Sequence, residues 1–119
     1  MSIICKILTV LIALEHFYFL YVEMFRWTAP RTRKAFGTTE EFAQASKVLA
    51  ANQGLYNGFL AAGLVWALVA GPDLGKALTI FFAGCVTVAG LYGGATANKR
   101  IFFVQALPGF LTLLSAFLL

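Results

Sequence analysis

The feature that most constrains this chain is a series of four apolar segments, each close to the length that crosses a lipid bilayer. They cover residues 3–25, 48–70, 76–96 and 101–119. A hydrocarbon core of roughly 30 Å is spanned by about 20 helical residues. The segments lack the alternation of polar and apolar residues that a membrane β-barrel needs. The sequence therefore predicts an all-α membrane protein, in which a single domain of residues 1–119 contains four transmembrane helices.

The composition leads to the same class. Hydrophobic residues make up 61% of the 119 residues and charged residues only 12%, whereas a soluble domain is usually about a quarter charged. So few charges cannot cover a water-soluble surface, and the lipid bilayer is therefore the expected partner. The first segment continues to Phe25 without a small-residue cleavage site, which favours a retained helix over a signal peptide.

Lys and Arg residues are distributed unevenly between the connecting segments. Five lie within residues 26–47 and two within 97–100, so seven of the nine fall on one side of the predicted membrane. Because basic loops stay in the cytosol, we expect a cytosolic loop at 26–47, both termini outside, and a multi-pass protein of a bacterial cytoplasmic (inner) membrane. The other connections are short, which favours an up-down-up-down bundle. The basic run at 31–34 suits anionic headgroups, and no nucleic acid partner is expected.

Local motifs refine this topology. Thr38 and Glu41 have the spacing of a capping box, so we expect the second helix to begin near Thr39 and to continue to Ala70. The pair Pro108 and Gly109 predicts a kink in the fourth helix. Two small-residue motifs, at residues 54–58 and 90–94, favour close helix packing within the bundle, with a homo-oligomer as the alternative.

Three sequence blocks are distinctive: residues 23–27 (EMFRW) followed by Pro30 and Arg31, residues 34–37 (KAFG), and residues 48–58 (VLAANQGLYNG). With these blocks the chain resembles, over essentially its whole length, the bacterial integral membrane protein family called domain of unknown function 1304. The resemblance implies a membrane protein with four helices. It implies no activity and no catalytic residue.

Polar residues inside the apolar segments are the candidates for function. A charged side chain at the bilayer centre costs about 2.5 to 3.5 kcal/mol on the insertion scale, so intramembrane Glu and His residues point to function. Glu15 and His16 lie in the middle of the first segment, level with Asn57 of the second if both helices end at the same depth. The predicted ligand-binding set, which occupies the cytosolic half, is Glu15, His16, Glu23, Gln53, Asn57, Tyr92 and Gln105.

These residues predict a polar intramembrane pocket that opens toward the cytosol. We expect it to bind, and in one version to transport, a small or amphiphilic ligand with proton coupling. The alternatives are an intramembrane acid-base enzyme, isomerase-like on a lipidic substrate, with Glu15 and His16 as catalytic candidates, and a structural partner of another membrane protein. A single His and two separated Cys residues predict no metal site, and no cofactor is expected.

Overall fold

The computed structural model describes residues 1–119 and is all α-helical, as predicted. The six α-helices and one π-helical turn are α1 (Ile3–Phe25), α2 (Pro30–Phe36), α3 (Glu40–Ala45), α4 (Lys47–Val69), α5 (Pro72–Thr96), η1 (Phe102–Ala106) and α6 (Leu107–Leu118). Two compact units divide the chain. The four-helix unit comprises Met1–Leu14 and Leu60–Leu119, and the connecting unit comprises Glu15–Phe59.

Two helices, α1 and α5, are long and apolar enough to cross a membrane. The last helical segment, Phe102–Leu118, is apolar but shorter. Helix α4 has 23 residues, but Asn52, Gln53 and Asn57 make its first half polar. By length and composition, therefore, two of the four expected spans are found.

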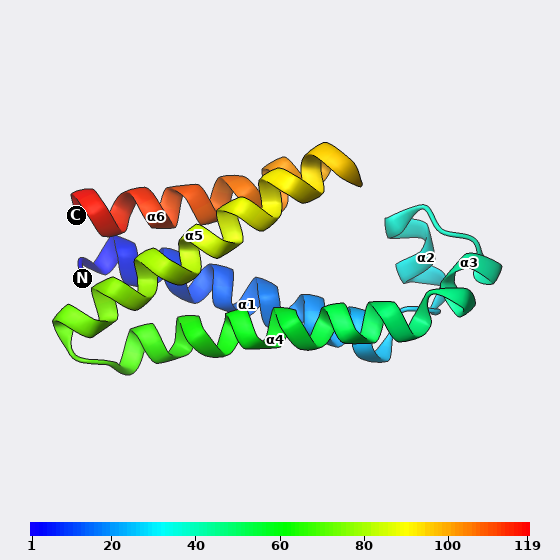
Figure 1. Cartoon of the computed structure of the whole chain (residues 1–119), viewed down its shortest axis with the longest axis horizontal. Coiled ribbons are helices and arrows are strands. Elements are labelled where there is room, and N and C mark those ends of the chain that lie inside the picture. The colour runs from blue at the N-terminus through cyan, green and yellow to red at the C-terminus, as the bar shows by residue number, and fades with distance from the viewer. The chain divides into compact units, whose positions relative to one another are not determined.

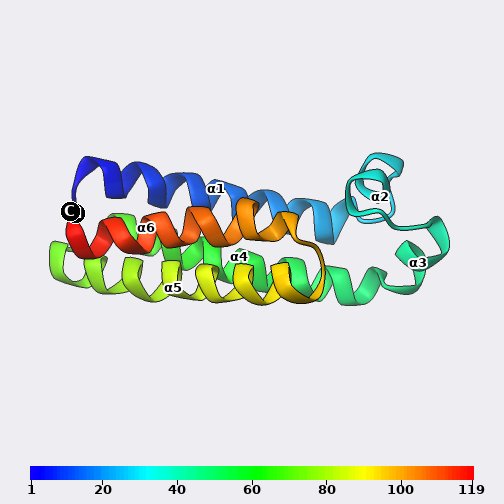
Figure 2. The same cartoon turned by 90° about the horizontal axis from the view of Figure 1, so that it is seen from above.

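The core of the four-helix unit draws on four helical segments. Ile12 of α1, Leu64 of α4 and Val86 of α5 are buried together, and Leu113 of α6 packs against them. Helices α5 and α6 lie side by side (Figures 1 and 2). Both chain termini, together with the turn between α4 and α5, lie at one end of this unit (Figure 1). The core thus joins segments that are far apart in sequence.

A π-helical turn precedes Pro108, where the sequence predicted a kink. The N–H of Leu107 donates to the carbonyl of Phe102, five residues back. Pro108 has no N–H, and its ring crowds the carbonyl four residues earlier. A π turn widens the helix by one residue per turn and so accommodates this loss of regular bonding. Gly109 then packs closely on α5, since a Cβ there would lie 2.8 Å from Cγ1 of Val86.

The connecting unit contains two short helices between α1 and α4 (Figure 2). Helix α2 begins with Pro30 at its first turn and ends at Gly37, whose φ of 68° is left-handed. Trp27 joins the two ends of this segment: its Nε1 donates to Oγ of Ser46 at 3.0 Å, and its ring packs on the edge of Phe36. Residues 26–47, expected as a loop with a helix start, are thus largely helical.

The prediction of one helix from Thr39 to Ala70 is wrong. Thr39 caps α3 by accepting from the N–H of Phe42, so the cap lies one residue after the expected Thr38. The helix then breaks at Ser46, whose φ and ψ are −98° and 5°. The Ser46 hydroxyl donates to the carbonyl of Phe42 and also accepts from Trp27. Such local side-chain bonds compete with helical bonding and explain the break.

Candidate functional site

Glu23 of α1 and Asn57 of α4 form the polar link between these helices within the connecting unit. Nδ2 of Asn57 donates to Oε1 of Glu23 at 2.5 Å. Asn57 is buried, with 7% of its surface exposed, and Glu23 is half-buried. Two of the seven predicted site residues are therefore brought together by a direct interhelical hydrogen bond.

Two glycines of α4 allow this approach. A Cβ on Gly54 would lie 3.0 Å from Cβ of Glu23 and 3.2 Å from the carbonyl oxygen of Leu20. A Cβ on Gly58 would lie 2.5 Å from Cδ1 of the same leucine. The motif at residues 54–58 thus packs two helices of one chain, as the sequence analysis favoured.

The glycine contacts also determine the register of the two helices. Gly58 meets Leu20, and Gly54 meets Glu23 and Met24. Asn57 is therefore level with the turn Leu20 to Glu23 and lies about one turn from the depth of His16. The prediction that Asn57, Glu15 and His16 share one depth assumed that α1 and α4 end together. In the structure the first residues of α4 run on past Phe25.

Unlike Glu23, which accepts a hydrogen bond from Asn57, Glu15 has a carboxyl oxygen without a hydrogen-bond partner. Its side chain is half-buried, and its Oε1 atom is buried without a hydrogen-bond partner. Leaving a buried polar atom unsatisfied costs about 1 to 3 kcal/mol, and more if it is charged. A buried acceptor of this kind calls for a partner outside the chain, such as a water, an ion or a ligand.

His16 is completely buried, with 0% of its surface exposed. Its ring lies edge-on to Phe19, with 5.2 Å between ring centroids. Consecutive residues of a helix point about 100° apart, so adjacency alone does not make Glu15 and His16 a paired acid and base. A half-buried carboxyl group and a fully buried imidazole nevertheless occupy neighbouring positions of an apolar helix.

Three other predicted residues differ in their exposure. Gln53 is exposed on α4, beside the buried Gly54. Tyr92 and Gln105 belong to the four-helix unit, where Tyr92 is 72% exposed and Gln105 is half-buried in the π turn. These positions do not test the expected polar pocket that opens toward the cytosol, and it stays a prediction.

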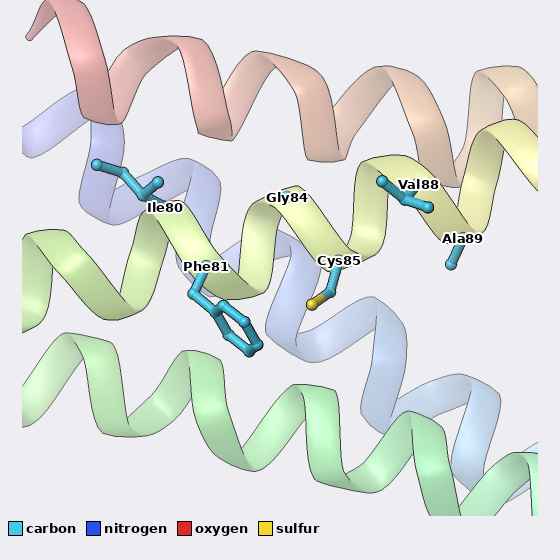
Figure 3. A pocket seen from close by; sticks show the side chains of 6 residues that line it. All are labelled: Ile80, Phe81, Gly84, Cys85, Val88 and Ala89. Carbon is cyan, nitrogen blue, oxygen red and sulfur yellow. The ribbon is translucent and has the colours of Figure 1, made fainter.

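A shallow apolar hollow lies on one face of α5 (Figure 3). Its lining residues are Ile80, Phe81, Gly84, Cys85, Val88 and Ala89. None of them is a charged or predicted site residue. Apart from the thiol of Cys85, the hollow offers no group for acid-base chemistry, and no charged side chain lines it.

The role of Trp27 and the helix α2 were both missed from the sequence. Signals for both were present. Pro30 is a favoured first residue of a helix, and Gly37 is a favoured residue just after a helix end. A serine before an apolar helix, such as Ser46, is a common hydrogen-bonding residue at a helix boundary.

Comparison with known proteins identifies the family. The profile described as "Protein of unknown function (DUF1304)" matches residues 10–117, so the chain belongs to this family, and the resemblance seen in the sequence is confirmed. The chain is also similar to "Uncharacterized protein YpaA" of Lactococcus lactis subsp. lactis (strain IL1403). The two are 35% identical over 119 residues, covering 98% of this chain and 99% of that protein. No solved structure matches.

Proposed function

We propose that this member of the DUF1304 family is a multi-pass protein of a bacterial cytoplasmic membrane, in which α1, α4, α5 and the η1–α6 segment all span. Only 28% of the most apolar stretch of α1 and 33% of that of α5 is buried within the chain, whereas a core helix of a soluble protein is mostly buried. Large exposed side chains such as Leu14, Phe81 and Phe117 suit lipid. Termini at one end of the four-helix unit agree with an even number of spans.

Within this membrane protein, the carboxyl group of Glu15 is the proposed binding group for a small or amphiphilic ligand. The observation that carries the proposal is the buried Oε1 atom without a hydrogen-bond partner. A structural role needs a satisfied network, as in the bond between Glu23 and Asn57. Glu15 instead keeps an acceptor available, which supports ligand binding with exchange of a proton.

Charge indicates the class of ligand. Glu15 and Glu23 are the acidic residues of α1, and no Lys or Arg lies between Ile7 and Phe25 or between Val48 and Val69. A carboxylate in apolar surroundings is costly unless a proton or another cation neutralises it. The ligand that replaces the proton is therefore a cation with enough apolar surface to enter the membrane.

The burial of His16 beside Glu15 favours one alternative, an intramembrane acid-base enzyme acting on a lipidic substrate. An imidazole and a carboxyl group are the usual groups for moving a proton. The two functions differ in their effect on lipid: an enzyme changes the lipids of a reconstituted membrane, whereas a binding or transport protein leaves them chemically intact.

A pair of probes of opposite charge and nearly equal size tests the proposed ligand class. We expect the purified protein to bind tetraphenylphosphonium saturably and at least about tenfold more tightly than tetraphenylborate, which corresponds to about 1.4 kcal/mol. Equilibrium dialysis in detergent micelles measures both affinities against micelles alone. Equal affinity for the two ions, or tighter binding of the anion, would remove the cation-binding role.

A further inference from the structure

The segment between α1 and α4 is an ordered structure with a defined exposed side. Trp27 closes it by its bond to Ser46 and its ring contact with Phe36. Nε of Arg33 donates to the carbonyl of Thr28 at 3.2 Å and so secures the start of α2. Thr32 and Ala43 form the buried side of the two short helices. Apart from the half-buried Arg33, the remaining side chains of α2 and α3 are exposed.

The outward side is strongly basic around α2. We call the exposed pair Arg31 and Lys34 of α2 the basic surface. Two further exposed basic residues, Arg26 and Lys47, lie near the ends of the segment, whereas Arg33 is half-buried. Arg31 and Lys34 are three residues apart and so share one face of α2. The acidic residues of the segment, Glu40 and Glu41, lie in the first turn of α3. The segment thus carries a net positive charge, and its exposed positive face lies on α2.

Two exposed aromatic rings belong to the same short helices, and Phe36 lies on the side of α2 opposite Lys34. Phe36, at the end of α2, is 48% exposed, and Phe42 of α3 is 57% exposed. Water does not favour exposed phenyl rings on short helices, whereas the boundary between headgroups and acyl chains accommodates aromatic and basic side chains together. This combination of residues is typical of a surface that rests on a membrane.

The short connection between α1 and α2 determines where α2 lies relative to the membrane. Helix α1 ends at Phe25, five residues before α2 begins, and α4 starts at Lys47, directly after Ser46. With α1 in the bilayer, a connection this short keeps α2 at the membrane surface. We infer that the basic surface binds the phosphate groups of anionic phospholipids, with Arg31 and Lys34 on the headgroup and the rings of Phe36 and Phe42 at the acyl boundary. The inference rests on the proposed membrane location and is independent of any ligand at Glu15.

Spin-labelled lipids test this inference with the full chain reconstituted in phosphatidylcholine. We expect labelled phosphatidylglycerol to be motionally restricted by the protein with about fivefold higher relative association than labelled phosphatidylcholine. The variant Arg31→Gln/Lys34→Gln should bring the two lipids close to equal association. A matched double variant, Lys6→Gln/Lys76→Gln, removes two exposed lysines outside the basic surface and should retain the preference.

The outcomes distinguish the proposed membrane location from the proposed binding of anionic phospholipids by the basic surface. Restricted lipid of either kind reports that the chain is embedded in the bilayer, while the ratio of the two lipids reports the basic surface. Equal association of both lipids with the wild-type protein overturns the inference, and so does an equal loss of preference in the two double variants. If the Arg31→Gln/Lys34→Gln protein does not fold, the lipid preference of the wild-type protein is measured at increasing salt concentration instead. The wild-type preference must then fall as ionic strength shortens the Debye length, and a salt-independent preference overturns the inference as well.

Discussion

Replacing Glu15 by Gln should lower the affinity for tetraphenylphosphonium by about tenfold or more while leaving the helices folded. The substitution removes the negative charge but keeps the size and the acceptor of the side chain. A bond to a charged group contributes about 1.5 to 3 kcal/mol, which corresponds to at least a tenfold change in affinity. Because Oε1 of Glu15 has no partner within the chain, no internal hydrogen bond to that atom is lost. Equilibrium dialysis measures the affinity, and far-ultraviolet circular dichroism monitors folding.

Glu23→Gln is the matched control on the same helix. A glutamine at this position still offers Oε1 to the amide of Asn57, so the link between α1 and α4 is retained. Affinity for the cation should change much less than in Glu15→Gln. A well-folded Glu15→Gln protein that binds the cation normally, or an equal loss in both variants, would assign Glu15 no special role.

Gly90→Ala should destabilise the folded protein by about 3 kcal/mol. A Cβ at this position would lie 2.3 Å from the backbone nitrogen of Ala106 and 2.5 Å from its Cα. Backbone atoms cannot rotate away as a flexible side chain does, so α5 and the π turn must separate. Unfolding in mixed micelles with increasing dodecyl sulfate, followed by circular dichroism, measures the change in the free energy of unfolding.

Gly84→Ala provides the control within α5. A Cβ there meets nothing within 4 Å, because Gly84 lies in the open hollow of Figure 3. Alanine is favoured over glycine inside a helix by about 1 kcal/mol. The variant should therefore be as stable as the wild-type protein or slightly more stable. Similar destabilisation by both substitutions would show that helix α5 does not approach Ala106 as closely as the structure describes.

The long helices were predictable because apolar length is a strong signal. The run that ends at Phe25 is helical over the whole predicted range. The start of α5 lies at Pro72, four residues before the predicted start, because proline at the first turn extends the helix into the expected loop. The break at Ser46 was not predictable from helix propensity. The Ser46 hydroxyl bonds both to the nearby carbonyl of Phe42 and to Trp27, a residue 19 positions away.

The bond between Glu23 and Asn57 was not predicted, although both residues were among the candidates. Glu23 and Asn57 were both singled out from sequence as polar residues in apolar segments, and they bond directly. Asn57 was expected level with Glu15 and His16, because both helices were assumed to end at one depth. The tight packing of Gly54 and Gly58 on α1 sets a register that differs from this expectation by about one turn. Side-chain contacts determine such a shift, and the length of an apolar segment does not predict them.

The reaction of Glu15 with dicyclohexylcarbodiimide in the reconstituted protein tests most directly whether its carboxyl group is available to a ligand. This apolar reagent enters the membrane and modifies carboxylic acids there, and peptide mapping by mass spectrometry identifies the residue. Glu15 should be modified well ahead of Glu23, which is bonded to Asn57, and tetraphenylphosphonium should protect it. The exposed Asp73 provides a reference for a carboxylate in water. Preferential modification of Glu23, or modification of Glu15 that the cation does not slow, would contradict a ligand-binding role for Glu15.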